Sequence, residues 1–218
     1  MHNACMDIAA QGHSRARTIL RLRPYYSMAQ LISFYRSQVL SYLEVYTAAV
    51  HHSNKFSMKS IDQVQSMFLE ELGVSVKNAL FEFHLAPFSS RRDIAILGFL
   101  HKIAWRQAPA SLLNLFPLGC SHYIRDLRAP GARHSKQLHD PIDGCQSAAM
   151  GRSAFGKVYV YNLLPKMVAE QPGTKGFQRK LQHGLKQACR AKVDNWQTFL
   201  SDGVKTLSVN VFQQMFSN

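Results

Sequence analysis

The segment from Gly151 to Val158, Gly-Arg-Ser-Ala-Phe-Gly-Lys-Val, almost matches a motif with known chemistry. It follows the phosphate-binding loop G-x-x-x-x-G-K-[ST] as far as Lys157. In that loop, backbone amides and the lysine hold phosphates, and a final hydroxyl binds Mg²⁺. Val158 stands where the hydroxyl is needed, and residues 146–150 make a poor buried strand. We therefore favour a flexible loop that leads into an aromatic helix over a nucleotide-binding site.

A second group of candidate chemical residues is rich in zinc-ligand types. Cys and His side chains are zinc ligands, and five of them lie in one segment: Cys120, His122, His134, His139 and Cys145. The sequence has no Cys-x2-Cys pair, and its ten histidines make chance clustering common. We interpret the segment as a solvated, His-rich linker, and we expect no metal and no cofactor.

Catalytic constellations are missing from the sequence. It contains no G-x-S-x-G elbow for a nucleophilic serine, and no cysteine lies beside a recognisable activating partner. Two-metal polymerases and nucleases need clustered carboxylates. The thirteen acids here are scattered, and the adjacent pair Glu70-Glu71 fits an ordinary helix surface. We expect no enzymatic activity from this chain on its own.

Basic residues offer the better candidates. Lys and Arg total 26 against 13 Asp and Glu, a formal charge of +13, which favours polyanionic partners, either nucleic acid or the surface of an anionic membrane. Three segments supply the candidate nucleic-acid-binding residues: Arg15, Arg17, Arg21 and Arg23; Arg91 and Arg92; and Lys175, Arg179, Lys180, Lys186, Arg190 and Lys192. The alternative is that these side chains are solvated helix faces.

Two details of these basic segments leave the alternatives open. Arg91-Arg92 at a helix start could clamp a phosphate, or could pair with Glu70, Glu71 or Glu82. Tyr25 and Tyr26 lie beside the first basic segment and could stack on bases, or could form the edge of the core.

Composition bounds the class of protein. Hydrophobic residues make up 46% of the chain, enough for a core, which excludes a wholly disordered basic tail. The longest apolar run, 95–100, is far short of the ~20 residues that span a bilayer. Four widely spaced cysteines without a secretory signal indicate an intracellular protein, nuclear or cytoplasmic and not secreted. The arginine-rich N-terminus loosely resembles a transit peptide, although it equally fits the polar face of a first helix.

Apolar periodicity predicts helices throughout, so the expected fold class is all-α. Ser27 and Gln30 form a capping-box pattern ahead of a helix that ends by 51–54. Residues 1–13 are expected to be frayed. The other expected helices are 14–22, a helix capped by Ser57 and stopped at Gly73, 75–83, a buried helix from Ser90 to Trp105, 112–116, 155–167, and a basic amphipathic helix capped by Thr174 that runs to about Leu200.

The change of composition at Gly119 suggests three parts. We expect a helical domain over 1–118, a loop or linker over 119–152, and a C-terminal helical segment over 153–218.

Four motifs resemble a known family in order and spacing. They are Leu31-Ile32-x-x-Tyr35-x-Ser37-x-Val39-Leu40-Ser41-Tyr42-Leu43-Glu44; Ile61-Asp62-x-Val64-Gln65-x-x-Phe68-Leu69 with Leu72-Gly73; Leu85-Ala86-Pro87-Phe88-x-x-Arg91-Arg92-Asp93-x-Ala95-x-Leu97 with Leu100-His101-Lys102-Ile103; and Phe155-Gly156-Lys157 with Tyr161-Asn162-Leu163-Leu164-Pro165. Together they resemble the region after the polymerase palm in reverse transcriptases of non-LTR (LINE-like) retrotransposons. Tyr161 stands where that family usually has Trp.

The resemblance covers about residues 20–165 and implies a thumb and C-terminal region. The family's polymerase activity depends on a Tyr-x-Asp-Asp box in the palm, and no Asp-Asp occurs here. The resemblance therefore implies a surface that grips the template–primer duplex, a missing palm as protein partner, and an exposed apolar patch where that palm packs. We expect a truncated or decayed retroelement product.

Two hypotheses from different classes follow. The first is a non-catalytic nucleic-acid-binding fragment of a retrotransposon reverse transcriptase. The second is an inert helical relic, or a protein-interaction module, whose basic residues only keep it soluble.

Overall fold

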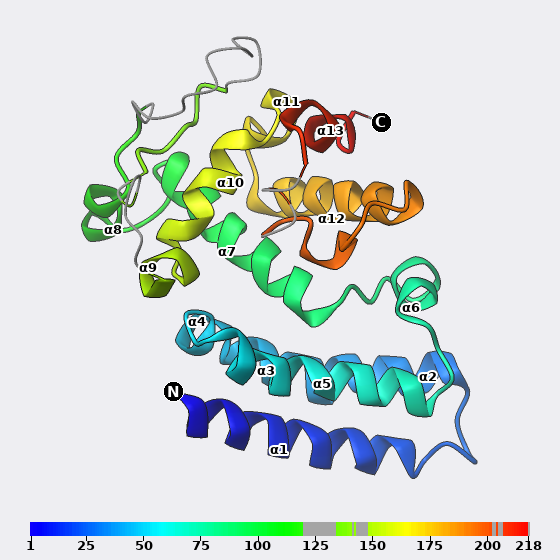
Figure 1. Cartoon of the computed structure of the whole chain (residues 1–218). Coiled ribbons are helices and arrows are strands. Elements are labelled where there is room, and N and C mark those ends of the chain that lie inside the picture. Colours follow the sequence, from blue (N-terminus) through cyan, green and yellow to red (C-terminus); the bar gives the residue numbers. More distant parts are fainter. Residues whose placement is uncertain (120–133, 141, 143–147, 202–203, 205–206, 218) are drawn as a thin grey trace. The chain divides into compact units, whose positions relative to one another are not determined.

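The computed structural model describes residues 1–119, 134–140, 142, 148–201, 204 and 207–217 (Figure 1). The chain divides into two compact units, Met1–Arg92 (unit 1) and Asp93–Asn218 (unit 2). The boundary lies within one helix, α7 (Phe88–Ala104), and differs from the boundaries expected at 118 and 152. The described residues form helices and one isolated β-bridge, Leu118–Leu138, which confirms the all-α class. None of the described helices is long and apolar enough to cross a membrane.

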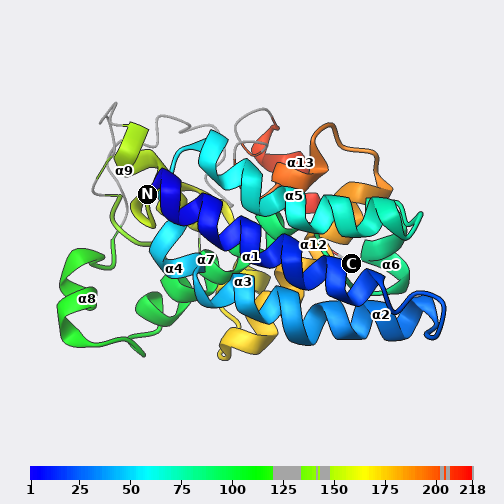
Figure 2. The same ribbon diagram turned by 90° about the horizontal axis from the view of Figure 1, so that it is seen from below.

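Unit 1 consists of helices packed around an apolar core. Besides the start of α7, they are α1 (His2–Leu20), α2 (Met28–Phe34), the π-helix η1 (Tyr35–Leu40), α3 (Ser41–Val45), α4 (Thr47–Val50), α5 (Lys55–Glu71) and α6 (Val76–Glu82). Figure 2 shows α1 lying between α5 on one side and the α2–α3 stretch on the other.

α1 is longer than expected, and the prediction of a frayed segment over 1–13 is wrong. The buried face of α1 follows the 3.6-residue period and consists of Cys5, Ile8, Ala9, Gly12, Ala16 and Ile19. All of these except the two isoleucines have small side chains. Gly12 permits a close approach, because a Cβ there would lie 3.1 Å from Leu43 and 3.2 Å from Val64. Small residues give a weak hydrophobic signal even where they are fully packed.

The expected helix after Ser27 is present, with its capping box formed between Ser27 and Gln30. Its interior contains the π-helical turn η1, which widens the helix and shifts the phase of the buried face. After Val39 the buried residues of this stretch are Leu40, Leu43 and Val50, whereas Tyr46 is exposed.

α5 begins earlier than predicted. Asn54, not Ser57, is its N-cap, and the Asn54 side chain accepts from the Ser57 amide at 2.7 Å. The C-terminal end agrees with the prediction, since Gly73 follows the helix with φ +69°. Ser75 caps α6 as the short-helix pattern indicated.

Unit 2 comprises the rest of α7 with α8 (Ala110–Leu115), α9 (Ala148–Arg152), the 3₁₀ turn η2 (Phe155–Lys157), α10 (Val158–Leu163), α11 (Lys166–Ala169), α12 (Thr174–Arg190), the 3₁₀ turn η3 (Trp196–Thr198) and α13 (Val209–Gln214). Leu97, Leu100 and Ile103 of α7 are buried. The Trp105 indole, just after α7, donates to the Ala169 carbonyl at 3.3 Å. These contacts place most of α7 in unit 2.

α12 ends at Arg190, so the prediction that it runs to about Leu200 is wrong. Lys192 and Asn195 both have φ +54°, a left-handed conformation that a helix interior does not allow. Phe199 and Leu200 are buried through a separate turn, which is why the apolar period continued past the helix end. The start also differs, because Gly173 occupies the N-cap position and Thr174 is the first helical residue.

The expected linker over 119–152 is described only in part. Residues 134–140 are packed rather than extended into solvent, with His134, Gln137 and Leu138 buried. Ala148–Arg152 forms α9.

Candidate nucleic-acid interface

A row of cationic side chains follows one side of α12. Lys175, Arg179, Lys186 and Arg190 are spaced by four, seven and four residues, so at about 100° per residue they share an arc of about 60°. At 1.5 Å per residue the row is about 22 Å long. Lys175, Arg179 and Arg190 are exposed and Lys186 is half-buried. We call these four residues the α12 row.

The two remaining candidates of this segment lie apart from the row. Lys180 is half-buried and projects about 80° or more away around the helix. Lys192 is exposed in the turn beyond the C-terminal end of α12.

The sequence around the α12 row contains no acidic residue. No Asp or Glu occurs between Glu170 and Asp194. The first turn of α12 has no acid, and its N-cap makes no side-chain hydrogen bond. The helix dipole disfavours a cation in that turn, so Lys175 adds positive charge to an already positive helix end.

The opposite side of α12 is anchored in the core of unit 2. Its buried residues are Phe177, Leu181, Gly184, Leu185, Ala188 and Cys189. Gly184 allows the Phe216 ring to lie directly against the helix, because a Cβ on Gly184 would lie 2.2 Å from that ring. This anchoring fixes which side of the helix carries the row.

The four arginines of α1 and the following turn are all exposed, but two of them serve unit 1 itself. The Arg15 guanidinium lies 4.0 Å from the centroid of the Tyr42 ring and donates to the Gln38 carbonyl at 3.2 Å. Arg23 donates to the Glu71 carbonyl at 2.8 Å, near the C-terminal end of α5. Arg17 and Arg21 are left as the candidate binding residues of this segment.

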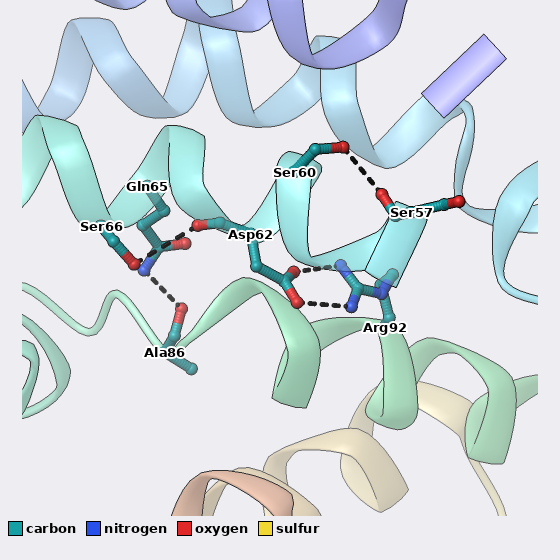
Figure 3. A network of polar contacts seen from close by, with 7 residues as sticks. All are labelled: Ser57, Ser60, Asp62, Gln65, Ser66, Ala86 and Arg92. Carbon is teal, nitrogen blue, oxygen red and sulfur yellow. Dashed lines mark hydrogen bonds and ion pairs between the residues drawn. The ribbon is translucent and has the colours of Figure 1, made fainter. Parts of the chain in front are cut away.

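Arg91 and Arg92 form ion pairs within unit 1. Arg92 makes a two-point contact with the Asp62 carboxylate, and Figure 3 shows this pair between α7 and α5. Close by, the Gln65 amide donates to the Ala86 carbonyl at 3.0 Å.

Arg91 pairs with Glu44, with 2.7 Å from Nε to Oε1. The partners are thus Asp62 and Glu44 rather than Glu70, Glu71 or Glu82. In this structure both guanidinium groups are paired with carboxylates, which is the second of the two interpretations, with other partners than those expected.

The segment that imitates a phosphate-binding loop has another structure. Lys157 ends the turn η2 and its ammonium lies 2.6 Å from Asp93 Oδ1, with both side chains only 13% exposed. Gly156 packs against the turn before it, since a Cβ there would lie 2.0 Å from the Gly151 carbonyl oxygen. The glycines and the lysine therefore serve a tight helical turn and an ion pair.

A buried polar cluster lies around Tyr161 in unit 2. The His101 ring stacks on Phe177, with centroids 4.0 Å apart and planes within 9°. Nε2 of His101 donates to the Gln171 carbonyl at 2.9 Å, so Nδ1 of the neutral ring accepts from the Tyr161 hydroxyl at 3.2 Å. Burial lowers the pKa of His101 to about 4, against a smaller opposing effect of the Gln171 hydrogen bond.

His134 closes the cluster from the other side. Its Nδ1 accepts from the Lys136 amide and its Nε2 donates to the Tyr161 carbonyl, each at 3.2 Å. Burial lowers the pKa of His134, so the ring is neutral at physiological pH. Asn162 bonds both backbone groups of Leu138, at 2.9 and 2.7 Å.

These contacts bear on the metal hypothesis. Both ring nitrogens of His134 are used by backbone groups, and His139 is exposed. Cys120, His122 and Cys145 lie outside the described residues. Within the described part of the chain, no group of three or more His, Cys, Asp or Glu side chains is placed to hold a metal ion.

Several polar residues of the four sequence motifs contact residues of another motif. Glu44 of the first motif pairs with Arg91 of the third, and Asp62 of the second pairs with Arg92. Asp93 and His101 of the third motif contact Lys157 and Tyr161 of the fourth, respectively. These contacts link segments far apart in the sequence within each unit.

Comparisons of the chain with models of known protein families, with curated proteins and with solved structures find no match.

Sequence reasoning missed the roles of His101 and His134. A lone histidine in an apolar helix gives little signal by itself. The helical spacing of Leu97, His101 and Ala104 places His101 on the buried face of α7, which was the one available clue.

Proposed function

We propose that this chain binds nucleic acid as the thumb and C-terminal region of a non-LTR retrotransposon reverse transcriptase, without catalysis of its own. The observation that carries the proposal is the α12 row, four cations on one side of a helix whose other side is anchored in the core. The ligand we propose is the backbone of an RNA or RNA–DNA duplex, in the nucleus or cytoplasm.

The chemistry of the row suits a phosphate backbone. Each strand of a duplex carries one phosphate for about every 3.4 Å of its axis, so a row about 22 Å long faces several phosphates. Lys and Arg that neutralise phosphates release counterions, which favours binding at low salt. Such contacts position the protein on a duplex without reading its sequence.

The contacts among the four motifs support the family part of the proposal. Residues that are weak signals one by one, such as Glu44 or Lys157, are partners of the Arg91-Arg92-Asp93 segment. A protein that kept these motifs would keep the same framework. The missing partner would be a palm that carries the paired aspartates.

Some exposed apolar side chains are available for such a protein partner. Val45 is 77% exposed and Phe56 is 75% exposed, both in unit 1. Under this proposal a palm would cover side chains of this kind.

Fluorescence anisotropy with a labelled RNA–DNA duplex tests the proposal. Contacts of 6–10 cations with phosphates weaken binding by about 10³–10⁵ between roughly 50 and 200 mM salt. A steep loss of this kind supports a phosphate-gripping protein. No binding at the lower salt, by a chain shown to be helical, would contradict it and leave the inert relic or the interaction module.

A further inference from the structure

The turn between α1 and α2 presents aromatic side chains to solvent. Tyr25 is 81% exposed, and Tyr26 is 41% exposed. The Tyr26 ring is held by an edge contact with Phe34, with centroids 5.2 Å apart, whereas no ring contact within the described chain holds Tyr25. We call Arg21, Arg23, Tyr25 and Tyr26 the tip.

Along the sequence, the charged residues nearest the tip are all basic. No Asp or Glu occurs between Asp7 and Glu44, a stretch that includes α1, the tip and α2. Arg21 is exposed, and Arg23 is held by its bond to the Glu71 carbonyl. A free aromatic face therefore lies within four residues of two guanidinium groups, with no acid nearby in the sequence.

We propose that the tip binds single-stranded nucleic acid by stacking an unpaired base on Tyr25, with Arg21 at a flanking phosphate. This proposal rests on the proposed function and adds a second kind of ligand, an unpaired stretch, to the duplex. Aromatic faces accept any base, and cations beside them follow the backbone, which is the usual chemistry of single-strand binding. An Arg guanidinium can also lie over an aromatic ring, which adds a cation–π attraction to the binding energy.

The tip fits a nucleic acid better than a membrane surface. Its most exposed ring carries a hydroxyl, and the neighbouring aliphatic side chains Leu22 and Met28 are 36% and 41% exposed, against 81% for Tyr25. Membrane-surface helices instead present a broad apolar face of Trp, Phe or Leu. α1 has no such face, because its apolar side is buried against α5.

The test compares an oligoriboadenylate of about 10 nucleotides with an abasic oligomer of the same length, which has the phosphates but no bases. The variants are Tyr25→Ala and Tyr25→Phe, the second of which keeps the aromatic ring. Tyr159→Ala is the control, since Tyr159 is 40% exposed in unit 2.

We expect Tyr25→Ala to weaken oligoadenylate binding by about 5- to 150-fold, the effect of one lost base stack. Binding of the abasic oligomer should not change. Tyr25→Phe should bind like the wild-type chain, and so should Tyr159→Ala.

Equal effects of Tyr25→Ala on both oligomers, or no effect on either, would overturn the proposal. So would Tyr25-dependent binding to vesicles of phosphatidylserine and phosphatidylcholine without oligoadenylate binding. If the chain binds the RNA–DNA duplex but Tyr25→Ala leaves the affinity for oligoadenylate unchanged, the tip proposal fails while the proposed function stands. If no nucleic acid binds, the proposed function fails with it.

Discussion

Arg92 and Asp62 meet in a two-point ion pair that joins α7 to α5, with Nη2 and Oδ2 3.0 Å apart. The Arg92 side chain is only 10% exposed and the Asp62 side chain 32% exposed. The neighbouring pair Arg91–Glu44 is more exposed to solvent, since the Arg91 side chain is 26% exposed and the Glu44 side chain 41% exposed. Two adjacent arginines thus make ion pairs of different burial, and these should differ in their contribution to stability.

Asp62→Asn should destabilise unit 1 by about 2–3 kcal/mol, because it leaves the Arg92 charge buried without its counterion. Glu44→Gln should cost only about 0.5–1 kcal/mol, since its pair is largely in water. Urea unfolding followed by far-UV circular dichroism measures both. Trp105 and Trp196 both lie in unit 2, so tryptophan fluorescence should be little changed by either variant. Equal costs for the two variants would contradict this ranking.

Two buried tyrosines offer a matched comparison. The Tyr161 hydroxyl donates to His101, whereas the buried Tyr35 hydroxyl has no hydrogen-bond partner among the described residues. Tyr161→Phe should therefore cost about 1–2 kcal/mol, and Tyr35→Phe should be neutral or slightly stabilising. Urea unfolding of both variants checks this. A larger cost for Tyr35→Phe than for Tyr161→Phe would refute the assignment of these hydroxyls.

The stability of unit 2 should fall in mild acid. The pKa of His101 is lowered to about 4 by burial, below the unfolded value of about 6.5. Between these two pKa values the unfolded chain binds more protons than the folded one. The free energy of unfolding therefore decreases as the pH falls below about 6.5. His101 alone accounts for about 2 kcal/mol between about pH 7 and pH 5, and the lowered pKa of His134 adds to it.

Trp105 fluorescence during urea unfolding measures this pH dependence, because its ring lies 6.0 Å from that of His101. The double variant His101→Gln/His134→Gln should flatten the dependence, and His139→Gln, at an exposed site, should leave it unchanged. A double variant with the full wild-type pH dependence would show that other groups cause it.

Two glycines should respond differently to alanine. Gly184→Ala places a methyl group 2.2 Å from the Phe216 ring and should cost about 1–3 kcal/mol. Adding Phe216→Leu should recover part of that loss. Gly156→Ala clashes with a backbone oxygen instead, so no side-chain change nearby should rescue it. Urea unfolding of the single and double variants separates the two cases. No recovery with Phe216→Leu would contradict the packing described for Gly184.

Much of this fold follows from local patterns. Ser27 and Gln30 form the expected capping box, and α2 begins where that pattern predicts. α1 escaped detection because Ala9, Gly12 and Ala16 bury little apolar area. The end of α12 was not predicted because the apolar period continues to Phe199 and Leu200, which are buried through a separate turn.

The candidate site was less accessible to sequence reasoning. Spacing along one helix defines the α12 row, so the sequence could predict it. The partners of Arg91, Arg92 and Lys157 lie 47, 30 and 64 residues away. No local pattern selects Asp62 over Glu70 as a partner, because tertiary packing decides which carboxylate reaches the guanidinium.

The salt dependence of duplex binding tests the central claim most directly. The variant Lys175→Gln/Arg179→Gln/Lys186→Gln/Arg190→Gln removes the α12 row. The control Lys59→Gln/Lys77→Gln/Lys102→Gln/Lys166→Gln removes four exposed cations elsewhere. Anisotropy titrations with the RNA–DNA duplex give the slope of log affinity against log salt for each. Each lost phosphate contact reduces the slope by about 0.9, so the row variant should lose about 3 to 4 and the control almost nothing. Equal slopes for the two variants would contradict the claim that α12 grips the duplex.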